Sequence, residues 1–419
     1  MNDRSQANAE ALQQLVTAEP VWVGVKRAGD VIPGLANNQL LHAGPPLQDR
    51  PQPLMRRALA GALVFEGNAQ TLEEGLAIVD AGDMHLSSCN DYQTVGPLAG
   101  VVSPSMPVIV VRTDGVEAYA PLNEGAGCVL RYGCVNDDVI AHLHFLKSRV
   151  AVLLDNLITS MDAIPVFDLA STALHMGDEC HHRFKAIQMA LALLLTERMD
   201  QLDWPLEDRR VVRSAILDND FFALNLVMAA GKAATLSAEG VPGSSLITVI
   251  ARNGNETGIR VSGLQDRWFT APVEAVDAVF IEPYGPSDAN PDTGDSCIVE
   301  INGLGGCALP AAPSLARWFG GTPEALIQLV DEMYRITLGE HPKFTVPWLG
   351  YRGTPVGIDC YKILEEGISP ITETLQTARE HAPGAVAIGI SRVPMQAIQE
   401  AVDMLEKIDI DKAKSYDLD

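Results

Sequence analysis

Apolar residues along positions 1–135 switch between strand-like and helix-like spacing. Short β-branched runs are bounded by turn residues, and longer stretches place apolar residues three and four positions apart. Thr71, followed by Glu74, forms a capping box that opens a helix. This alternation predicts an α/β layer, with helices over 5–17, 54–66 and 71–81, strands over 21–25, 107–111 and 116–121, and a strand end at 40–46.

The apolar pattern changes to an almost wholly helical one between residues 136 and 240. Apolar residues recur there at three- and four-residue spacing, most clearly over 186–195 and 221–236. We therefore expect a mainly helical segment at 136–240.

Strand-like patterns return in residues 241–419. The runs 246–252 and 257–261 flank Asn253-Gly254, a dipeptide that favours a tight hairpin because both residues tolerate positive φ. We expect further strands at 278–282 and 386–390, helices at 322–338 and 395–407, and a frayed acidic end at 409–419. The fold class expected is α/β and α+β, multidomain, with an α/β domain at 1–135, a helical segment at 136–240 and an α+β domain at 241–419.

The charge balance narrows the classes of partner. The net charge of −24 disfavours nucleic acid and anionic membrane surfaces as partners. A small anionic substrate stays possible, because a few buried arginines can dominate locally.

Cysteine usage and the N-terminus indicate a cytoplasmic protein. Seven irregularly spaced cysteines without a CxxC pair are typical of reduced thiols. Residues 1–19 are polar and lack the apolar stretch of a secretory signal. The longest nearly apolar run, 186–195, is about half of the ~20 residues that span a bilayer.

Polar, glycine-rich loops carry the candidate chemistry, since nucleotide-binding, zinc-protease and serine-hydrolase motifs do not occur. The first loop is 122–127, with Asn123 and Glu124, followed by Arg131. Backbone N–H groups in such a loop can bind an anion and Arg131 can add charge, although a plain solvated turn explains the same residues equally well.

The second candidate is the stretch 176–183. We expect a helix to begin near Gly177, which would place Asp178 with His182, and Glu179 with Arg183, on shared faces. Glu179 and His182 also have the three-residue spacing of helical metal sites, but no second such pair exists to complete one. A cluster of salt bridges at the helix start is the main alternative to an acid–base site.

The third candidate is the hairpin 252–263 and its continuation to residue 272. Arginines and asparagines concentrate there, and arginine forks match carboxylate and phosphate groups. The alternative is a structural hairpin whose arginines lie on a solvent-exposed face. The site interpretation rests on Arg252, Asn253, Asn255, Arg260 and Arg267.

Two further features complete the set. Asp292 and Asp295 lie in a glycine-containing loop and can orient the arginines or accept amide N–H groups, although a solvated acidic loop is as plausible. His42 lies at a strand end, where sites gather in α/β layers, although a structural histidine is more common there.

As an ordered set, these loops resemble the YlbE/AllG family of bacterial proteins over residues 20–395. The motifs that carry the resemblance are Leu41–Pro46, Leu122–Gly127 with Arg131–Gly133, Met176–Glu179, Arg252–Asn255, Gly258–Gly263, Arg267–Pro272 and Asn290–Ser296. The resemblance implies a subunit of oxamate carbamoyltransferase, which acts in anaerobic allantoin breakdown. It also implies an FdrA-like partner, a further small subunit, and a homodimer or larger hetero-oligomer.

That reaction converts oxalurate and phosphate into oxamate and carbamoyl phosphate. It requires donors for anions and for a tetrahedral oxyanion, so we expect no cofactor and no metal. The arginines of the third loop would bind anions, its asparagines would hold the ureido group, and His42 or His182 would donate a proton, oriented by Glu179 or Asp178. The alternatives are a structural or regulatory subunit of an FdrA-type complex, or an amidohydrolase for a ureido compound.

Overall fold

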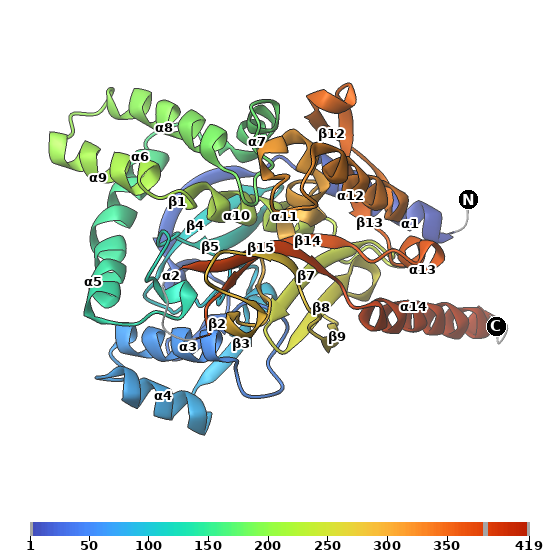
Figure 1. The fold of residues 1–419 in the computed structure, drawn as a ribbon, viewed down its shortest axis with the longest axis horizontal. Helices are drawn as coiled ribbons and strands as arrows, with labels where there is room; N and C mark the ends of the chain where they lie inside the picture. Colours follow the sequence, from blue (N-terminus) through green and yellow to red (C-terminus); the bar gives the residue numbers. More distant parts are fainter. Residues whose placement is uncertain (1–2, 380–383, 417–419) are drawn as a thin grey trace.

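Helices and strands alternate along the chain, and the helices concentrate in its middle third (Figure 1). The structure is a computed structural model that describes residues 3–379 and 384–416. The helices are α1 (Asp3–Thr17), α2 (Ala28–Val31), α3 (Pro53–Glu66), α4 (Leu72–Ala81), α5 (Asp137–Phe145), α6 (Ala151–Thr159), α7 (Val166–His175), α8 (Lys185–Met199), α9 (Leu206–Leu217), α10 (Phe222–Ser237), α11 (Ile298–Ile301), α12 (Pro323–Ile336), α13 (Cys360–Glu366) and α14 (Met395–Tyr416).

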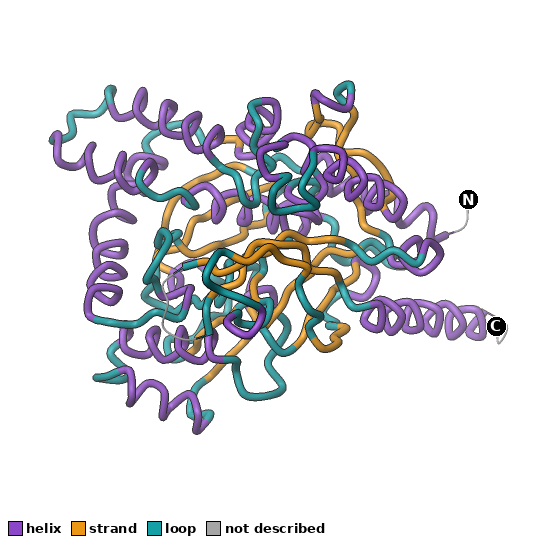
Figure 2. Tube along the Cα trace, in the orientation of Figure 1, coloured by secondary structure: helices purple, strands orange, loops and turns teal. Residues whose placement is uncertain are grey.

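The strands gather near the centre of the molecule and helices surround them (Figure 2). They are β1 (Val21–Arg27), β2 (Gln39–His42), β3 (His85–Ser88), β4 (Pro107–Thr113), β5 (Val116–Pro121), β6 (Ile164–Pro165), β7 (Ile247–Asn253), β8 (Glu256–Val261), β9 (Phe269–Pro272), β10 (Asp277–Phe280), β11 (Thr293–Gly294), β12 (Thr337–Val346), β13 (Arg352–Ile358), β14 (Ile371–Thr377) and β15 (Ala385–Arg392). The fold is mixed α/β, as the sequence predicts.

Most strands pair in small antiparallel sheets. The sheet orders are β5-β4-β1-β6, β11-β7-β8-β9 and β10-β15-β14, with a β12-β13 hairpin and a parallel β2-β3 pair. β12, β13 and β14 were not predicted from the sequence. β14 matters most for function, because its residues reach the candidate site described below.

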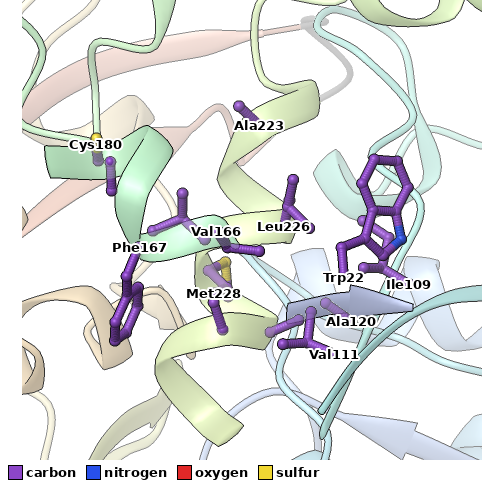
Figure 3. Packing of buried hydrophobic residues seen from close by; sticks show 14 of the residues in the cluster. Trp22, Ile109, Val111, Ala120, Val166, Phe167, Cys180, Ala223, Leu226 and Met228 are labelled. Carbon is purple, nitrogen blue, oxygen red and sulfur yellow. The ribbon is translucent and has the colours of Figure 1, made fainter. Parts of the chain in front are cut away.

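The β5-β4-β1-β6 sheet packs against buried helices. α10 contacts β4 and β5, and α6 contacts β1. Figure 3 shows Trp22 and Val111 of this sheet near Leu226 and Met228 of α10, with Val166 of α7 beyond them. Every residue of α10 from Phe222 to Thr235 is buried, so this helix lies within the core and not on the surface.

The hydrophobic core is shared among the three predicted segments. Its largest cluster draws residues from Ala7 to Val356, whereas a second cluster lies within residues 247–405. A shared core describes how the segments pack and does not test whether each folds alone. The boundaries near residues 135 and 240 therefore stay a prediction.

The predicted hairpin is present, but its turn lies one residue later than expected. Asn253 is the last residue of β7, and Gly254 and Asn255 form the turn. Gly254 has φ of 88°, which glycine adopts without steric cost. Asn253 holds the turn through its side chain, whose Oδ1 accepts the backbone N–H groups of Asn255 at 2.9 Å and Glu256 at 2.8 Å.

Two further expectations need correction. Cys128 and Cys134 form a disulfide, so the seven cysteines are not all free thiols. The spacing of six residues does not by itself indicate a disulfide. The turn between the two cysteines brings them together. At the C-terminus, α14 continues to Tyr416, so fraying does not begin at Asp409, and residues 417–419 lie outside the described part. Among the described helices, none has the length and apolar character needed to cross a membrane.

Candidate functional site

Six chain segments from all three predicted regions line one small pocket. They are 97–98, 131–132, 181–182, 221–224, 293–296 and 374–375. The free volume of about 30 Å³ fits a small ion or a few ligand atoms, since one water needs roughly 10–15 Å³. The pocket brings together Arg131, the histidines of the stretch 176–183 and the residues that flank Asp295, all close to candidates nominated from the sequence.

Arg131 forms one wall of this pocket and is buried there. Its guanidinium lies 4.8 Å from the Tyr132 ring and 5.2 Å from the Phe221 ring, and Nη2 donates to the Gly125 carbonyl at 2.7 Å. Its Nε has no hydrogen-bond partner among the described residues. A buried guanidinium whose Nε has no partner is suited to binding a carboxylate or phosphate.

Asn123 and Glu124 hold the loop that leads to Arg131. Asn123 donates to the Asn225 side chain at 2.7 Å, and Glu124 accepts the Leu130 N–H at 2.6 Å. Burial raises the pKa of Glu124 to about 7. Both residues line a neighbouring cavity of about 520 Å³ and not the small pocket. They therefore hold Arg131 in position without lining that pocket themselves.

The stretch 176–184 is not the helix start that its spacing predicts, because α8 begins only at Lys185. Gly177 has φ of 99° and Cys180 has φ of 68°, which are incompatible with a continuous helix. Asp178 instead accepts the N–H groups of Ala186 and, at 3.1 Å, of Ile187, and so caps α8 from a distance.

Glu179 stabilises the turn around Cys180. Its Oε1 accepts three backbone N–H groups, from His182 and, each at 3.0 Å, from His181 and Arg183. A non-glycine residue in the left-handed region costs of order 1–3 kcal/mol and is characteristic of functional sites. This turn directs the two histidines toward the pocket.

Each histidine contacts a buried glutamate from a distant part of the chain. His181 Nδ1 lies 2.7 Å from Glu300 Oε1, and His182 Nδ1 lies 2.5 Å from Glu373 Oε2. His181, Glu300 and Glu373 were not nominated from the sequence. Two signals were available: Glu300 interrupts an apolar run, and Glu373 lies in a threonine-rich stretch, 371–377, with strand-like alternation.

Burial has the largest effect on the pKa values of the glutamates and of His182 in this cluster. It raises the pKa of Glu179 to about 7, with added repulsion from Glu373, and it raises the pKa of Glu373 to about 8. Burial would also raise the pKa of Glu300, but the adjacent His181 holds it below its usual value. Burial lowers the pKa of His182. The raised pKa values favour the protonated, uncharged form of Glu179 and Glu373 near neutral pH.

Arg252 lies beneath the pocket instead of lining it. Its Nη1 donates to Asp292 at 2.7 Å and to Thr372 at 2.9 Å, and Thr374, a pocket residue, donates to Asp292 at 2.6 Å. Asp295 accepts N–H groups at 2.7 Å and 3.1 Å from two glycines, Gly44 and Gly96. Burial raises the pKa of Asp295 to about 7. These aspartates anchor loops and the floor of the pocket.

The remaining nominated residues of the third loop lie elsewhere. Asn253 donates to the Pro45 carbonyl at 3.0 Å, and Asn255 to the Arg50 carbonyl at 3.0 Å. Arg260 is buried and contacts Asp266 at 3.0 Å and Glu239 at 3.9 Å. Arg267 contacts the Met404 sulfur at 3.4 Å. None of these groups lines the small pocket.

His42 is buried in β2, with Nδ1 at 2.8 Å from the Ala43 carbonyl, and does not line the pocket. Burial lowers its pKa from 6.5 to about 4. Between these values the unfolded chain binds a proton that the folded protein does not, so stability is lost as pH falls through this window. The full difference is about 3 kcal/mol.

We therefore expect His42→Gln to lose less stability than the wild type between pH ~7 and pH ~4, as measured by unfolding midpoints across that range. His85→Gln, at an exposed position, serves as the control and should keep the wild-type slope. Equal slopes for all three proteins would contradict the interpretation. A folded His42→Gln protein without activity would instead support a role for His42 in proton donation.

Comparisons with known proteins place this geometry in context. Residues 84–296 match the profile of a family described as oxamate carbamoyltransferase subunit AllG. The chain is 36% identical over 408 residues to the protein of that name from Escherichia coli K12, covering 96% of this chain and 97% of the relative. It is also 36% identical over 399 residues to the uncharacterized protein YahG from the same organism, covering 94% and 84%.

A crystal structure has nearly the same fold. It is that of a conserved protein of unknown function from Enterococcus faecalis V583, with a TM-score of 0.93 and 35% sequence identity. The match covers 97% of this chain and 98% of that one. The whole arrangement of elements is thus shared with a solved structure.

Proposed function

The chain belongs to the AllG family, and we propose on this basis that it is a carbamoyltransferase subunit acting on a small ureido-carboxylate. The proposed substrates are oxalurate and phosphate, and the products are oxamate and carbamoyl phosphate. The observation that carries the proposal is the small pocket, which is lined by two histidines and by a buried arginine whose Nε has no partner among the described residues.

The chemistry requires anion binding and stabilisation of an oxyanion. A phosphate oxygen forms a bond to the carbamoyl carbon, and the bond from that carbon to the oxamate nitrogen breaks. The hydroxyl proton of the phosphate passes to that nitrogen, so atoms, charge and protons balance. The intermediate is a tetrahedral oxyanion, which preorganised donors stabilise in a pocket shielded from water.

Residues that line the pocket are suited to binding one end of the substrate, because the free volume of about 30 Å³ admits a few ligand atoms. Arg131 matches the planar carboxylate of oxalurate or an edge of phosphate. Ser296, Thr293 and Thr374 also line the pocket and carry hydroxyl groups. Of the three residues nominated as catalytic, His182 lines the pocket, whereas Glu179 shapes the turn that carries it.

A second candidate function is that of a structural or regulatory subunit of a complex with an FdrA-like partner. One observation favours it: large apolar side chains are exposed along the helical region at Phe145, Val152, Met189, Leu193, Leu206 and Leu217. Such exposure is typical of a surface that another protein covers. This function would leave the reacting groups to the partner.

The test is to co-express the chain with its FdrA-like and small partner subunits and to measure carbamoyl phosphate formed from oxalurate and phosphate. We expect formation only when this chain is present. Unchanged formation without it would overturn the catalytic proposal. A chain that binds its partner but neither oxamate nor phosphate in calorimetry would support the structural role. Carbamoyl release without phosphate would indicate an amidohydrolase.

A further inference from the structure

We propose that His181, His182 and Glu373 bind a divalent first-row transition-metal ion at the wall of the small pocket. One ligand atom from each of these three residues lies within 4.8 Å of the other two. The glutamate side chain is fully buried, and the histidine side chains are 4% and 7% exposed. Two imidazoles and a carboxylate in one buried place form a donor set suited to such an ion.

Unused carboxylate oxygens are the second, independent observation. Glu179, Glu300 and Glu373 are each fully buried, and each directs all its hydrogen bonds to one oxygen. The other oxygens, Oε2 of Glu179, Oε2 of Glu300 and Oε1 of Glu373, find no partner among the described residues. Leaving a buried charged oxygen unpaired is strongly unfavourable unless a cation or a proton compensates it.

The protein itself supplies little compensating charge. In the described ranges, 3–379 and 384–416, the ion pairs of Glu300 and Glu373 are those with His181 and His182, and none joins a lysine or arginine to the three glutamates. With all three carboxylates ionised, the two histidines would not balance their charge even if both were protonated. A divalent cation would make the cluster close to neutral.

The supporting contacts resemble those that orient metal-bound histidines. Glu300 Oε1 lies 2.7 Å from His181 Nδ1 and also accepts the backbone N–H groups of Gly306 at 3.0 Å and Glu373 at 3.1 Å. A carboxylate behind one ring nitrogen fixes the tautomer and leaves the other nitrogen as the ligand atom. Glu300 is thus a positioning residue for His181.

The ligand types decide which ions fit. Imidazole nitrogen suits Zn²⁺, Fe²⁺, Co²⁺ and Ni²⁺, whereas Mg²⁺ and Ca²⁺ prefer sites made only of oxygen. The helical Glu179–His182 spacing does not form this site, because Glu179 Oε1 is committed to the backbone of the turn. The carboxylate that pairs with His182 belongs to Glu373, which is 191 residues away in the sequence. No sequence pattern indicates this pairing.

The open side of the site faces the pocket that Arg131 closes. Resting on the proposed function, the ion would chelate the carboxylate oxygen and the neighbouring carbonyl oxygen of oxamate or oxalurate. Three protein ligands leave coordination positions free for such a molecule. Arg131 would bind the remaining negative charge.

The test measures metal bound to the full-length chain alone, so its outcome is separate from transferase activity. Protein stripped with a chelator is equilibrated with Zn²⁺, and bound zinc is measured by mass spectrometry after gel filtration. We expect about one tightly bound ion per chain. The absorption spectrum of the Co²⁺-loaded protein should show d–d bands of nitrogen and oxygen ligation.

Two variants and a control locate the ion. Glu373→Gln and His181→Asn should each weaken Zn²⁺ binding by about 100-fold or more, beyond the 10–100-fold effect typical of a merely orienting residue. His341→Asn removes an equally buried histidine that accepts the backbone N–H groups of Lys343 and Phe344, and should bind zinc like the wild type. Circular dichroism confirms that each variant is folded.

Wild-type protein that binds no Zn²⁺ or Co²⁺ would overturn the inference. Folded Glu373→Gln and His181→Asn proteins that bind both ions like the wild type would also overturn it. Metal binding in a chain that proves inactive with its partners would leave the inference standing and reject the proposed reaction.

Discussion

Arg131→Ala should lower kcat/KM for carbamoyl phosphate formation by the assembled complex by about 10²–10³-fold. The reason is that Arg131 is the arginine that lines the small pocket, and its Nε has no partner among the described residues. Arg131→Lys should recover only part of this loss, because an ammonium group does not reproduce the planar fork that matches a carboxylate or phosphate. Initial rates over a range of oxalurate and phosphate concentrations provide the measurement.

Two other arginines serve as controls for this prediction. Arg57 does not line the small pocket but donates to the carbonyl of Gly133, two residues after Arg131, at 2.8 Å. Arg57→Ala should therefore retain most activity. Arg260 is as buried as Arg131 but lies outside the pocket, and the sequence alone nominated it as an anion-binding residue. A larger loss with Arg260→Ala than with Arg131→Ala would move the anion site to the third loop and reject the pocket.

Asp292→Ala should lower the free energy of unfolding more than any other single substitution proposed for this protein. Arg252 and Asp292 form a fully buried ion pair with an N···O distance of 2.7 Å. Removing one partner of such a pair typically costs about 3–5 kcal/mol, because the other charge stays buried without compensation. The unfolding midpoint should fall by roughly 3–6 °C, because a chain of this length has a large unfolding entropy. Thermal unfolding followed by circular dichroism measures the change.

The matched comparisons separate burial from pairing. Asp80→Ala breaks an exposed pair with Arg56 and should leave the midpoint almost unchanged. The double variant Arg252→Met, Asp292→Ala removes the uncompensated charge and should be more stable than Asp292→Ala alone. If Asp80→Ala and Asp292→Ala lowered the midpoint equally, the buried pair would not carry the proposed energy.

Local patterns predicted much of the fold because their causes are local. The capping residue Thr71 accepts the Glu74 N–H at 3.2 Å, and Thr322 accepts the Ala325 N–H at 3.2 Å, as their positions before the two helices indicate. The stretch 176–184 escaped prediction because its shape depends on Cys180 in the left-handed region, held by three contacts to Glu179. Helical spacing gives no information about such a turn.

The candidate site was predictable only in part. Arg131 and His182 were nominated from glycine-rich loops and do line the pocket. His181, Glu300 and Glu373 were missed because each is recognisable as a site residue only through its histidine–glutamate pair. The members of the two pairs are 119 and 191 residues apart in the sequence. Arg260 and Arg267 were nominated because they are dense in the sequence, but neighbours along a hairpin need not point into one pocket.

The sequence by itself determined most of the longer helices, several of the strands, the hairpin at Asn253 and the family resemblance, because each is encoded in periodicity or in ordered motifs. Only the tertiary structure decided which charged groups lose water and meet. Burial of Glu179, Glu300 and Glu373 around two histidines arises from packing between segments far apart in the chain. That desolvation turns ordinary glutamates into groups that require a proton or a cation, and local sequence cannot encode it.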